Sequence, residues 1–245
     1  CPSCNTLFHK NSVTLGLKNF VGTVGRKQCL AHHRDGGIAA GGDEYPDSSL
    51  LKRICVRLEG MTNGNRSELA RRILGFGLRV DHRLMKMLRV NPVFDGEWHG
   101  NDTCWRMVHD LVRIVRYGTR EGRLANRPQR PILTIVDGIV AGEGNGPLQA
   151  DARTDGCVIV GVNPVLTDIV TATLMGFDHE KIALLREAGR IETWPLCQTP
   201  AHEARLMVDD RTLTFDELSE AELLRPFRAP DGWLNHMERD ARPVC

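Results

Sequence analysis

The sequence predicts an α/β protein with a mostly parallel sheet and flanking helices, and two segments carry this prediction. In the first, 132–147, a β-branched apolar run ends at Asp137 and leads into a glycine-rich stretch. In the second, Cys157 to Val162 form a buried strand that runs into Asn163-Pro164, a favourable cap and first residue for a helix over 165–175. Two strands with a helix after the second favour a right-handed crossover, which places strands in parallel.

Composition sets the class of protein. The 245 residues suit a single α/β domain over 1–245, with a helical insert at about 50–120. A net charge of +1 and an aromatic content of 5% argue against nucleic acid as a partner, because they supply neither a basic field nor stacking surfaces. The eight cysteines are scattered, which is typical of a reducing, cytoplasmic setting. No apolar run reaches the roughly 20 residues of a membrane span.

The first 50 residues are predicted to be largely irregular. The chain begins in mid-pattern and without an initiating Met, so we expect a fragment whose sheet is incomplete on its N-terminal side. A short helix is expected at 13–20, in a stretch crowded with basic side chains that indicates either an anion site or a solvated loop. The loop 30–50 holds His32-His33 and Asp43-Glu44, but adjacent side chains of an extended chain point in opposite directions, which disfavours a metal site.

The clearest helix lies at 66–90, after a short helix or strand at 49–59. Its apolar side chains form one continuous stripe, while seven basic and two acidic side chains occupy other faces. A helix packed on its own domain with a solvated basic face is the favoured interpretation. The alternative is a helix that lies on an anionic membrane surface. The stripe consists of Leu69, Ile73, Phe76, Val80, Leu84 and Met87.

Shorter elements complete the chain. A helix over 105–117 follows the good N-cap residues 101–103 and ends before Gly118. In the last third we expect a helix at 179–188, short strands at 205–208 and 212–215, and a helix at 216–224 that begins with acidic residues, as the helix dipole prefers.

Candidate site residues gather where the predicted strands end. Asp137 and Glu143 offer carboxylates there, and the helix that starts at Asn163 offers backbone N–H donors to an anion, with Asp168 in its early turns. The stretch Gly144-Asn145-Gly146 lacks bulky side chains, so a ligand can approach its backbone closely. We expect these groups to share one hollow with the N-terminal segment, which adds His9, Lys10, Lys18 and Asn19.

The predicted chemistry is acid–base catalysis by Asp137, Glu143, Lys18 and His9. The two carboxylates are also candidates for holding a divalent metal. A plainer interpretation of Asp137 is a turn-forming residue before a glycine. The phosphate loop of nucleotide hydrolases and the dinucleotide fingerprint are both absent, so ATP and NAD bound in those ways are not expected. Cys1 and Cys4 have metal or redox spacing, but an iron–sulfur cluster needs four ligands, so an intrinsic cluster is not expected.

Five ordered blocks of the sequence resemble the bacterial "domain of unknown function 362" family. They are VTLGLKNFVG (13–22), GDEYPDSSL (42–50), GNDTCWRMVHDL (100–111), VDGIVAGEGNGP (136–147) and NPVLTDIVTATLMGFDHEKI (163–182). The resemblance implies an α/β fold and a distant similarity to the nickel-cofactor lactate racemase family. It also implies a site at the matched positions, which are His9, Lys10, Lys18, Asn19, Asp137, Glu143, Asn145, Asn163 and Asp168.

The chain departs from that family in two respects. The usual N-terminal strand and its following helix are missing, which agrees with an incomplete sheet. The cysteine run that binds a ferredoxin-type cluster in some members is also absent, which puts an iron–sulfur role in doubt.

Residues and resemblance together lead us to expect an enzyme that acts on a small anionic metabolite, of isomerase, racemase or lyase type. One alternative is a peripheral membrane or interaction module that uses the helix 66–90. Another is an iron–sulfur-associated electron-transfer protein that uses Cys1 and Cys4.

Overall fold

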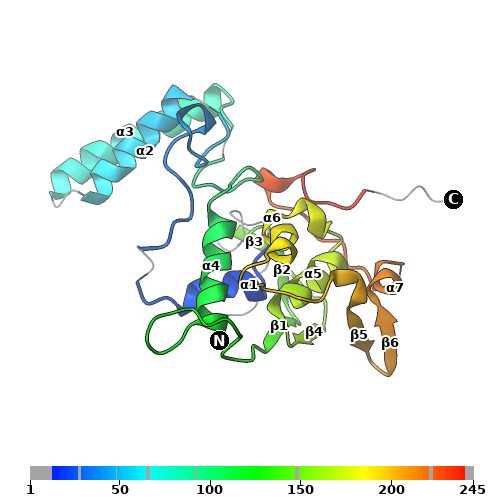
Figure 1. Ribbon diagram of the computed structural model, residues 1–245. Coiled ribbons are helices and arrows are strands. Elements are labelled where there is room, and N and C mark those ends of the chain that lie inside the picture. Colours follow the sequence, from blue (N-terminus) through cyan, green and yellow to red (C-terminus); the bar gives the residue numbers. More distant parts are fainter. Residues whose placement is uncertain are drawn as a thin grey trace.

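A computed structural model describes residues 13–26, 29–47, 49–64, 67–91, 93–146, 149–220 and 223–240. Figure 1 shows that the described strands and most of the helices gather in one body, from which helices α2 (Leu50–Gly64) and α3 (Glu68–Met87) project together as a hairpin. Helix α4 (Cys104–Tyr117) lies along the body, and its first turn faces the base of this hairpin.

The described β-structure consists of three separate two-stranded sheets, each of them antiparallel. Strand β1 (Thr134–Gly138) pairs with β4 (Cys157–Gly161), and β2 (Ala141–Asn145) pairs with β3 (Gln149–Arg153). The third pair is β5 (Arg205–Val208) with β6 (Arg211–Thr214). The predicted mostly parallel sheet with flanking helices is therefore wrong.

The segment between β1 and β4 explains this error. We expected a ligand-binding glycine loop at 142–146, but 141–145 form strand β2. A parallel pair needs a crossover, usually through a helix, that brings the chain back to the starting edge of the sheet. The β2–β3 pair instead returns the chain to the end of β1 that it had just left. Strand β4 therefore runs antiparallel to β1, with Val136 opposite Ile159.

Helix α5 (Pro164–Leu174) is the centre of the hydrophobic core. Most of its residues are buried. It contacts strand β4 and three helices, α1 (Gly16–Asn19), α6 (Ala183–Arg186) and α7 (Phe215–Glu220). Two of its three threonines bond their hydroxyls within the helix: Thr167 Oγ1 donates to the Asn163 carbonyl at 2.8 Å and Thr171 Oγ1 to the Thr167 carbonyl at 2.7 Å, whereas Thr173 Oγ1 is buried without a hydrogen-bond partner. Such internal bonds let polar side chains sit in the core without an unpaired donor.

The carboxylate of Asp168, on α5, joins the first described segment to this core. Its two oxygens accept hydrogen bonds from the backbone N–H groups of Gly16 and Leu17, both at 2.8 Å, at the start of helix α1 (Gly16–Asn19). The contact requires glycine at position 16, because a Cβ there would lie 2.5 Å from Thr134 Cγ2 and 2.9 Å from Asp168 Oδ1. Helix α1, strand β1 and helix α5 therefore meet at one point.

Besides α5, and apart from the hairpin described below, the described chain forms one longer helix and a series of short ones. Helix α4 (Cys104–Tyr117) confirms the helix expected at 105–117. The helix expected at 179–188 is divided into η4 (His179–Lys181), α6 (Ala183–Arg186) and η5 (Glu187–Arg190). The extended backbone of Ile182 separates η4 from α6, and η5 continues α6 directly as a 3-10 helix. The other helices are α7 (Phe215–Glu220), η1 (Phe20–Thr23), η3 (Ile38–Ala40), η6 (Ala201–Glu203) and η7 (Asp231–Trp233).

The projecting hairpin consists of α2 (Leu50–Gly64) and α3 (Glu68–Met87), which pack against each other. Its base is held by Lys52, whose fully buried ammonium donates to the Val93 carbonyl at 3.0 Å and lies 3.1 Å from Asp47 Oδ2. The burial of Asp81 and Met85 marks one side of α3, and the predicted apolar stripe lies on another, where its side chains are 38% to 71% exposed. The apolar stripe is therefore exposed, whereas the favoured interpretation had it packed on the protein's own domain. No helix among the described residues combines the length and the apolar character needed to cross a bilayer.

Replacement of Gly16 by Ala tests the meeting point of α1, β1 and α5. The new methyl group must push Thr134 or the Asp168 carboxylate aside, so we expect a loss of about 1–3 kcal/mol in the free energy of unfolding. Denaturant unfolding measures the loss. Gly25→Ala is the matched control, because a Cβ at Gly25 meets no atom within 4 Å. Equal stability of the two variants would contradict the proposed crowding.

Candidate functional site

The Asp168 carboxyl group is completely buried, and two opposing effects act on its pKa. Burial raises its pKa to about 7, and the two hydrogen bonds from Leu17 and Gly16 oppose this rise. Both oxygens of the carboxyl group accept hydrogen bonds from the first two N–H groups of helix α1. In this structure Asp168 therefore orders the N-terminal segment from within the core.

Lys18 and Asn19 follow on α1 and point to different surroundings. The Lys18 side chain is buried, and its Nζ donates to Cys104 Sγ at 3.3 Å at the start of α4. Asn19 is exposed. Lys18 thus links α1 to α4 and is not among the residues that line the cleft described below.

The predicted glycine stretch contacts the chain's own C-terminal segment. Glu143 Oε2 accepts from the Arg228 N–H at 3.1 Å, and the Gly144 N–H donates to the Arg228 carbonyl at 3.0 Å. Gly144 has a φ of +73°, and a Cβ there would collide with the Arg228 guanidinium, so glycine is required for this contact. Asn145 makes two hydrogen bonds with Asp231, at 2.9 and 3.0 Å. The N–H of Gly146 donates back to the Gly144 carbonyl at 2.9 Å.

Asn163 is the predicted N-cap. Its Oδ1 accepts from the Val165 and Leu166 N–H groups at 2.9 and 3.2 Å, and its Nδ2 donates to the Leu196 carbonyl. Two of the donors that we expected to face an anion are therefore already bonded. Asp137 is exposed at the end of β1, where Oδ1 accepts from the Ile139 N–H at 3.1 Å, which is the geometry of a turn-forming aspartate.

Asp137 and Asn163 do share one hollow, a cleft of about 870 Å³ that we call the α5 cleft. Strands β1 and β4 form one wall, and helix α5, strand β5 and the segment after α7 form the others. Leu15, just before α1, also reaches it. The lining is largely apolar, as in most small-molecule sites. Glu143, Asn145, Lys18 and Asp168 do not line it, so the structure brings together only part of the predicted constellation.

The polar end of the α5 cleft surrounds Cys157. Burial and the nearby Asp155 raise the pKa of the Cys157 thiol, Arg225 lowers it, and Asp137 contributes a smaller raising effect. Asp155 has only 4% of its side chain exposed; its Oδ1 binds Arg153 Nε at 3.0 Å, while its Oδ2 is buried without a hydrogen-bond partner. A buried carboxylate oxygen without a donor is unfavourable in a native protein. The sequence does not reveal that Asp155, Cys157 and Arg225 belong to one site, because no motif marks them and only the fold brings them together.

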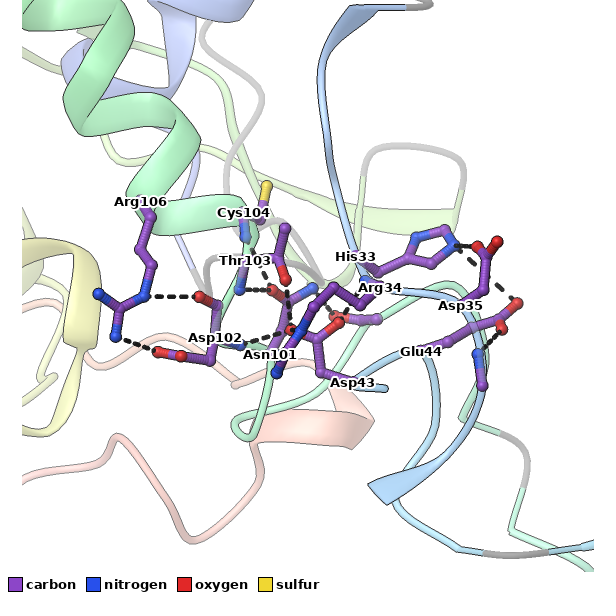
Figure 2. A network of polar contacts seen from close by, with 12 residues as sticks. His33, Arg34, Asp35, Asp43, Glu44, Asn101, Asp102, Thr103, Cys104 and Arg106 are labelled. Atoms are coloured by element: carbon purple, nitrogen blue, oxygen red, sulfur yellow. Dashed lines mark hydrogen bonds and ion pairs between the residues drawn. The ribbon is translucent and has the colours of Figure 1, made fainter. Parts of the chain in front are cut away.

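A second polar network ties two of the sequence blocks together at the start of α4 (Figure 2). Asp43 is 2% exposed, and its Oδ2 accepts from the Asp102 N–H at 3.0 Å and from Thr103 Oγ1 at 2.6 Å. Asn101 Oδ1 accepts from the N–H groups of Thr103 and Cys104 at 3.0 and 2.9 Å. The blocks 42–50 and 100–111 thus form one cap for α4, which positions Cys104 against Lys18.

Two groups of side chains among the described residues have three potential metal ligands within reach of one another. One is His33, Asp35 and Glu44, beside the cap of α4 in Figure 2, and the other is Cys55, Glu59 and His82 on the hairpin. Neither includes the predicted candidates Asp137 and Glu143. The remaining predicted residues, Cys1, Cys4, His9 and Lys10, lie outside the described residues.

The comparison with protein families decides the family. A family model described as "Domain of unknown function (DUF362)" matches residues 9–173. The chain belongs to this family. The resemblance of the five sequence blocks is thereby confirmed, whereas a similarity to the lactate racemase family is not shown. No curated protein and no solved structure matches the chain. The DUF362 match covers β1 to β4 and nearly all of α5, while Arg225 and strand β5 of the α5 cleft lie beyond it.

The raised pKa of Asp168 predicts how stability depends on pH. Between about pH 4 and about 7 the folded chain holds a proton on Asp168 that the unfolded chain releases, so the free energy of unfolding falls as pH rises through this interval. Asp168→Asn cannot titrate and should show a smaller fall. Urea unfolding at a series of pH values measures this, with the exposed Asp216→Asn as the control. The same fall in wild type and Asp168→Asn would show that Asp168 does not titrate there.

Proposed function

We propose that this DUF362 protein is an enzyme that acts on a small anionic metabolite bound in the α5 cleft. The observation that supports this most directly is the buried, unpartnered Oδ2 of Asp155 in a cleft of ligand size. A ligand hydroxyl or amino group would supply the missing hydrogen-bond donor. The substrate class is therefore a small metabolite that carries an anionic group together with a hydroxyl or an amine.

The cleft lining carries two basic side chains for the anionic group, beside the four acidic side chains of Asp137, Asp155, Glu203 and Asp209. Arg225 and Arg205 line the cleft and offer positive charge to the anionic group, while the apolar side chains of α5 and β4 contact its carbon skeleton. Asp137 is the acid–base candidate that remains in the cleft. The Cys157 thiol, with its raised pKa, is protonated at neutral pH and acts as a neutral lining group, since the thiolate is the nucleophile.

Blocking the cleft tests the proposal. A thermal-shift screen of small hydroxy- and amino-carboxylates and phosphates is expected to yield ligands that stabilise the wild type. At about 100 times Kd the gain is about 2.7 kcal/mol, which corresponds to roughly 5–10 °C in Tm for a chain of this size. Val160→Trp, which fills the cleft from β4, and Asp155→Asn, which replaces the unpartnered oxygen by a donor, should both abolish the shift.

The matched control for the cleft variants is Val140→Trp, because Val140 is exposed to nearly the same degree as Val160, 53% against 59%, and does not line the cleft. It should respond to ligand as the wild type does. The proposal fails if no compound in the panel raises Tm, or if Val160→Trp binds as well as Val140→Trp. Asp137→Asn should retain binding and lose turnover of the compound identified.

A second candidate function is contact with an anionic membrane surface through α3, and the exposure of its apolar stripe favours it. Ile73, Phe76 and Met87 are 62% to 71% exposed, and Arg72, Arg79 and Arg83 lie beside the stripe at helical spacing. An interfacial helix combines such an apolar face with flanking basic residues.

Sedimentation with vesicles tests the membrane contact. The protein should bind vesicles of anionic phosphatidylserine at low salt and not vesicles of zwitterionic phosphatidylcholine, and binding should weaken as salt screens the arginines. Ile73→Asp should reduce binding at least about 10-fold, because it places a charge in the buried face. Leu133→Asp, at a position of equal exposure on the body, should have no effect. Binding that is indifferent to lipid charge, or a hairpin that pairs with a second copy instead, would exclude this function.

A further inference from the structure

Three side chains with metal-ligating atoms converge between the two helices of the hairpin, away from the α5 cleft, and the carboxylate of Asp81 interacts with one of them, Cys55. Cys55 and Glu59 lie one turn apart on α2, at positions that share a face, and Asp81 and His82 are adjacent on α3. Cys55 Sγ is 3.4 Å from His82 Nε2 and 3.9 Å from Glu59 Oε1. The ligand atoms of Cys55, Glu59 and His82 all lie within 4.8 Å of one another.

Asp81 is the independent observation that points to a ligand. Its side chain is buried, with 4% of the residue exposed, and it interacts with the Cys55 thiol. Its Oδ2 nevertheless has no hydrogen-bond partner. A buried carboxylate oxygen is normally paired with a donor or bound to a cation, because its desolvation is otherwise uncompensated.

The composition of the group indicates the sign of the missing partner. Cys55, Glu59 and Asp81 bring three acidic side chains together beside one imidazole. A cation at this point stabilises the thiolate and the carboxylates together.

We propose that the α2–α3 hairpin of this protein holds a divalent transition metal of the zinc class, bound by Cys55, His82, Glu59 and Asp81. Thiolate and imidazole ligands select zinc and similar ions, whereas calcium and magnesium prefer sites made of oxygen. A set of one sulfur, one nitrogen and two carboxylates satisfies the tetrahedral coordination of zinc. Binding displaces the thiol proton of Cys55 and any proton on Asp81 into solvent.

The position of the site suggests a structural role. Each helix exposes apolar residues to solvent, and glycines at 60, 75 and 77 weaken the helices from within. A metal bound by two residues from each helix cross-links them and fixes their register. In such sites the free energy of metal binding contributes directly to folding.

Cobalt substitution tests the proposal on the full chain. The protein is kept in a metal-free buffer with a reductant, so that its cysteines stay as thiols. Addition of Co²⁺ to the wild type should produce a thiolate-to-cobalt charge-transfer band in the near ultraviolet and the visible bands of a tetrahedral ion, and Zn²⁺ should displace both. Cys55→Ser should lose the charge-transfer band. His82→Ala, at an exposed position whose replacement spares the core, should weaken Co²⁺ binding by at least about 100-fold.

Two controls separate this site from the other candidates. Cys29→Ser removes an exposed cysteine, and His33→Ala removes the histidine of the other three-ligand group; both should bind Co²⁺ as the wild type does. Circular dichroism of each variant verifies that the helices persist. The proposal is overturned if the wild type shows no thiolate band, if the band survives in Cys55→Ser, or if His82→Ala keeps its helices and binds Co²⁺ with wild-type affinity.

Discussion

The body of the protein depends on the two hydrogen bonds between the buried carboxylate of Asp168 and the start of helix α1. Asp168 lies in the middle of the most buried helix and binds the N–H groups of Gly16 and Leu17, more than 150 residues away in sequence. A charge in such a place is costly unless hydrogen bonds compensate it. The same contact fixes the segment whose next residue, Lys18, reaches Cys104 and so the start of α4. Three elements from distant parts of the chain are thus placed by one side chain.

Local signals predicted local structure well. Asn163-Pro164 begins α5, and residues 101–103 precede α4, because capping depends on a few neighbouring residues. The helix at 66–90 was also evident from its spacing, and α3 spans most of it. The spacing did not predict which side of this helix packs against the rest of the chain. The buried side of α3 carries Asp81 and Met85, so the more regular stripe is the one left outside.

The pairing of the strands and much of the site could not be predicted from the sequence, because they too depend on which distant segments pack together. Glycines at 142, 144 and 146 predict close approach to a backbone, and close approach occurs, but at Gly144 the neighbour is Arg228 of the same chain rather than a ligand. Asp137 and Asn163 were found because both follow strand or cap patterns. Asp155 and Arg225 acquire meaning only once β4 lies beside β1 and the segment after α7 closes the cleft, which are contacts between residues far apart in sequence.

The boundary of the family match has a consequence for how the chain can be divided. The match ends at Thr173, one residue before the end of α5. Two parts of the body lie after it: the segment around Arg228, which is hydrogen-bonded to β2, and strand β5, which lines the α5 cleft. A recombinant piece cut at that boundary would expose the apolar side of α5 and the Glu143–Asn145 edge to water. The family match therefore covers a region of the sequence, whereas the hydrophobic core extends beyond it to Trp233 and Met237.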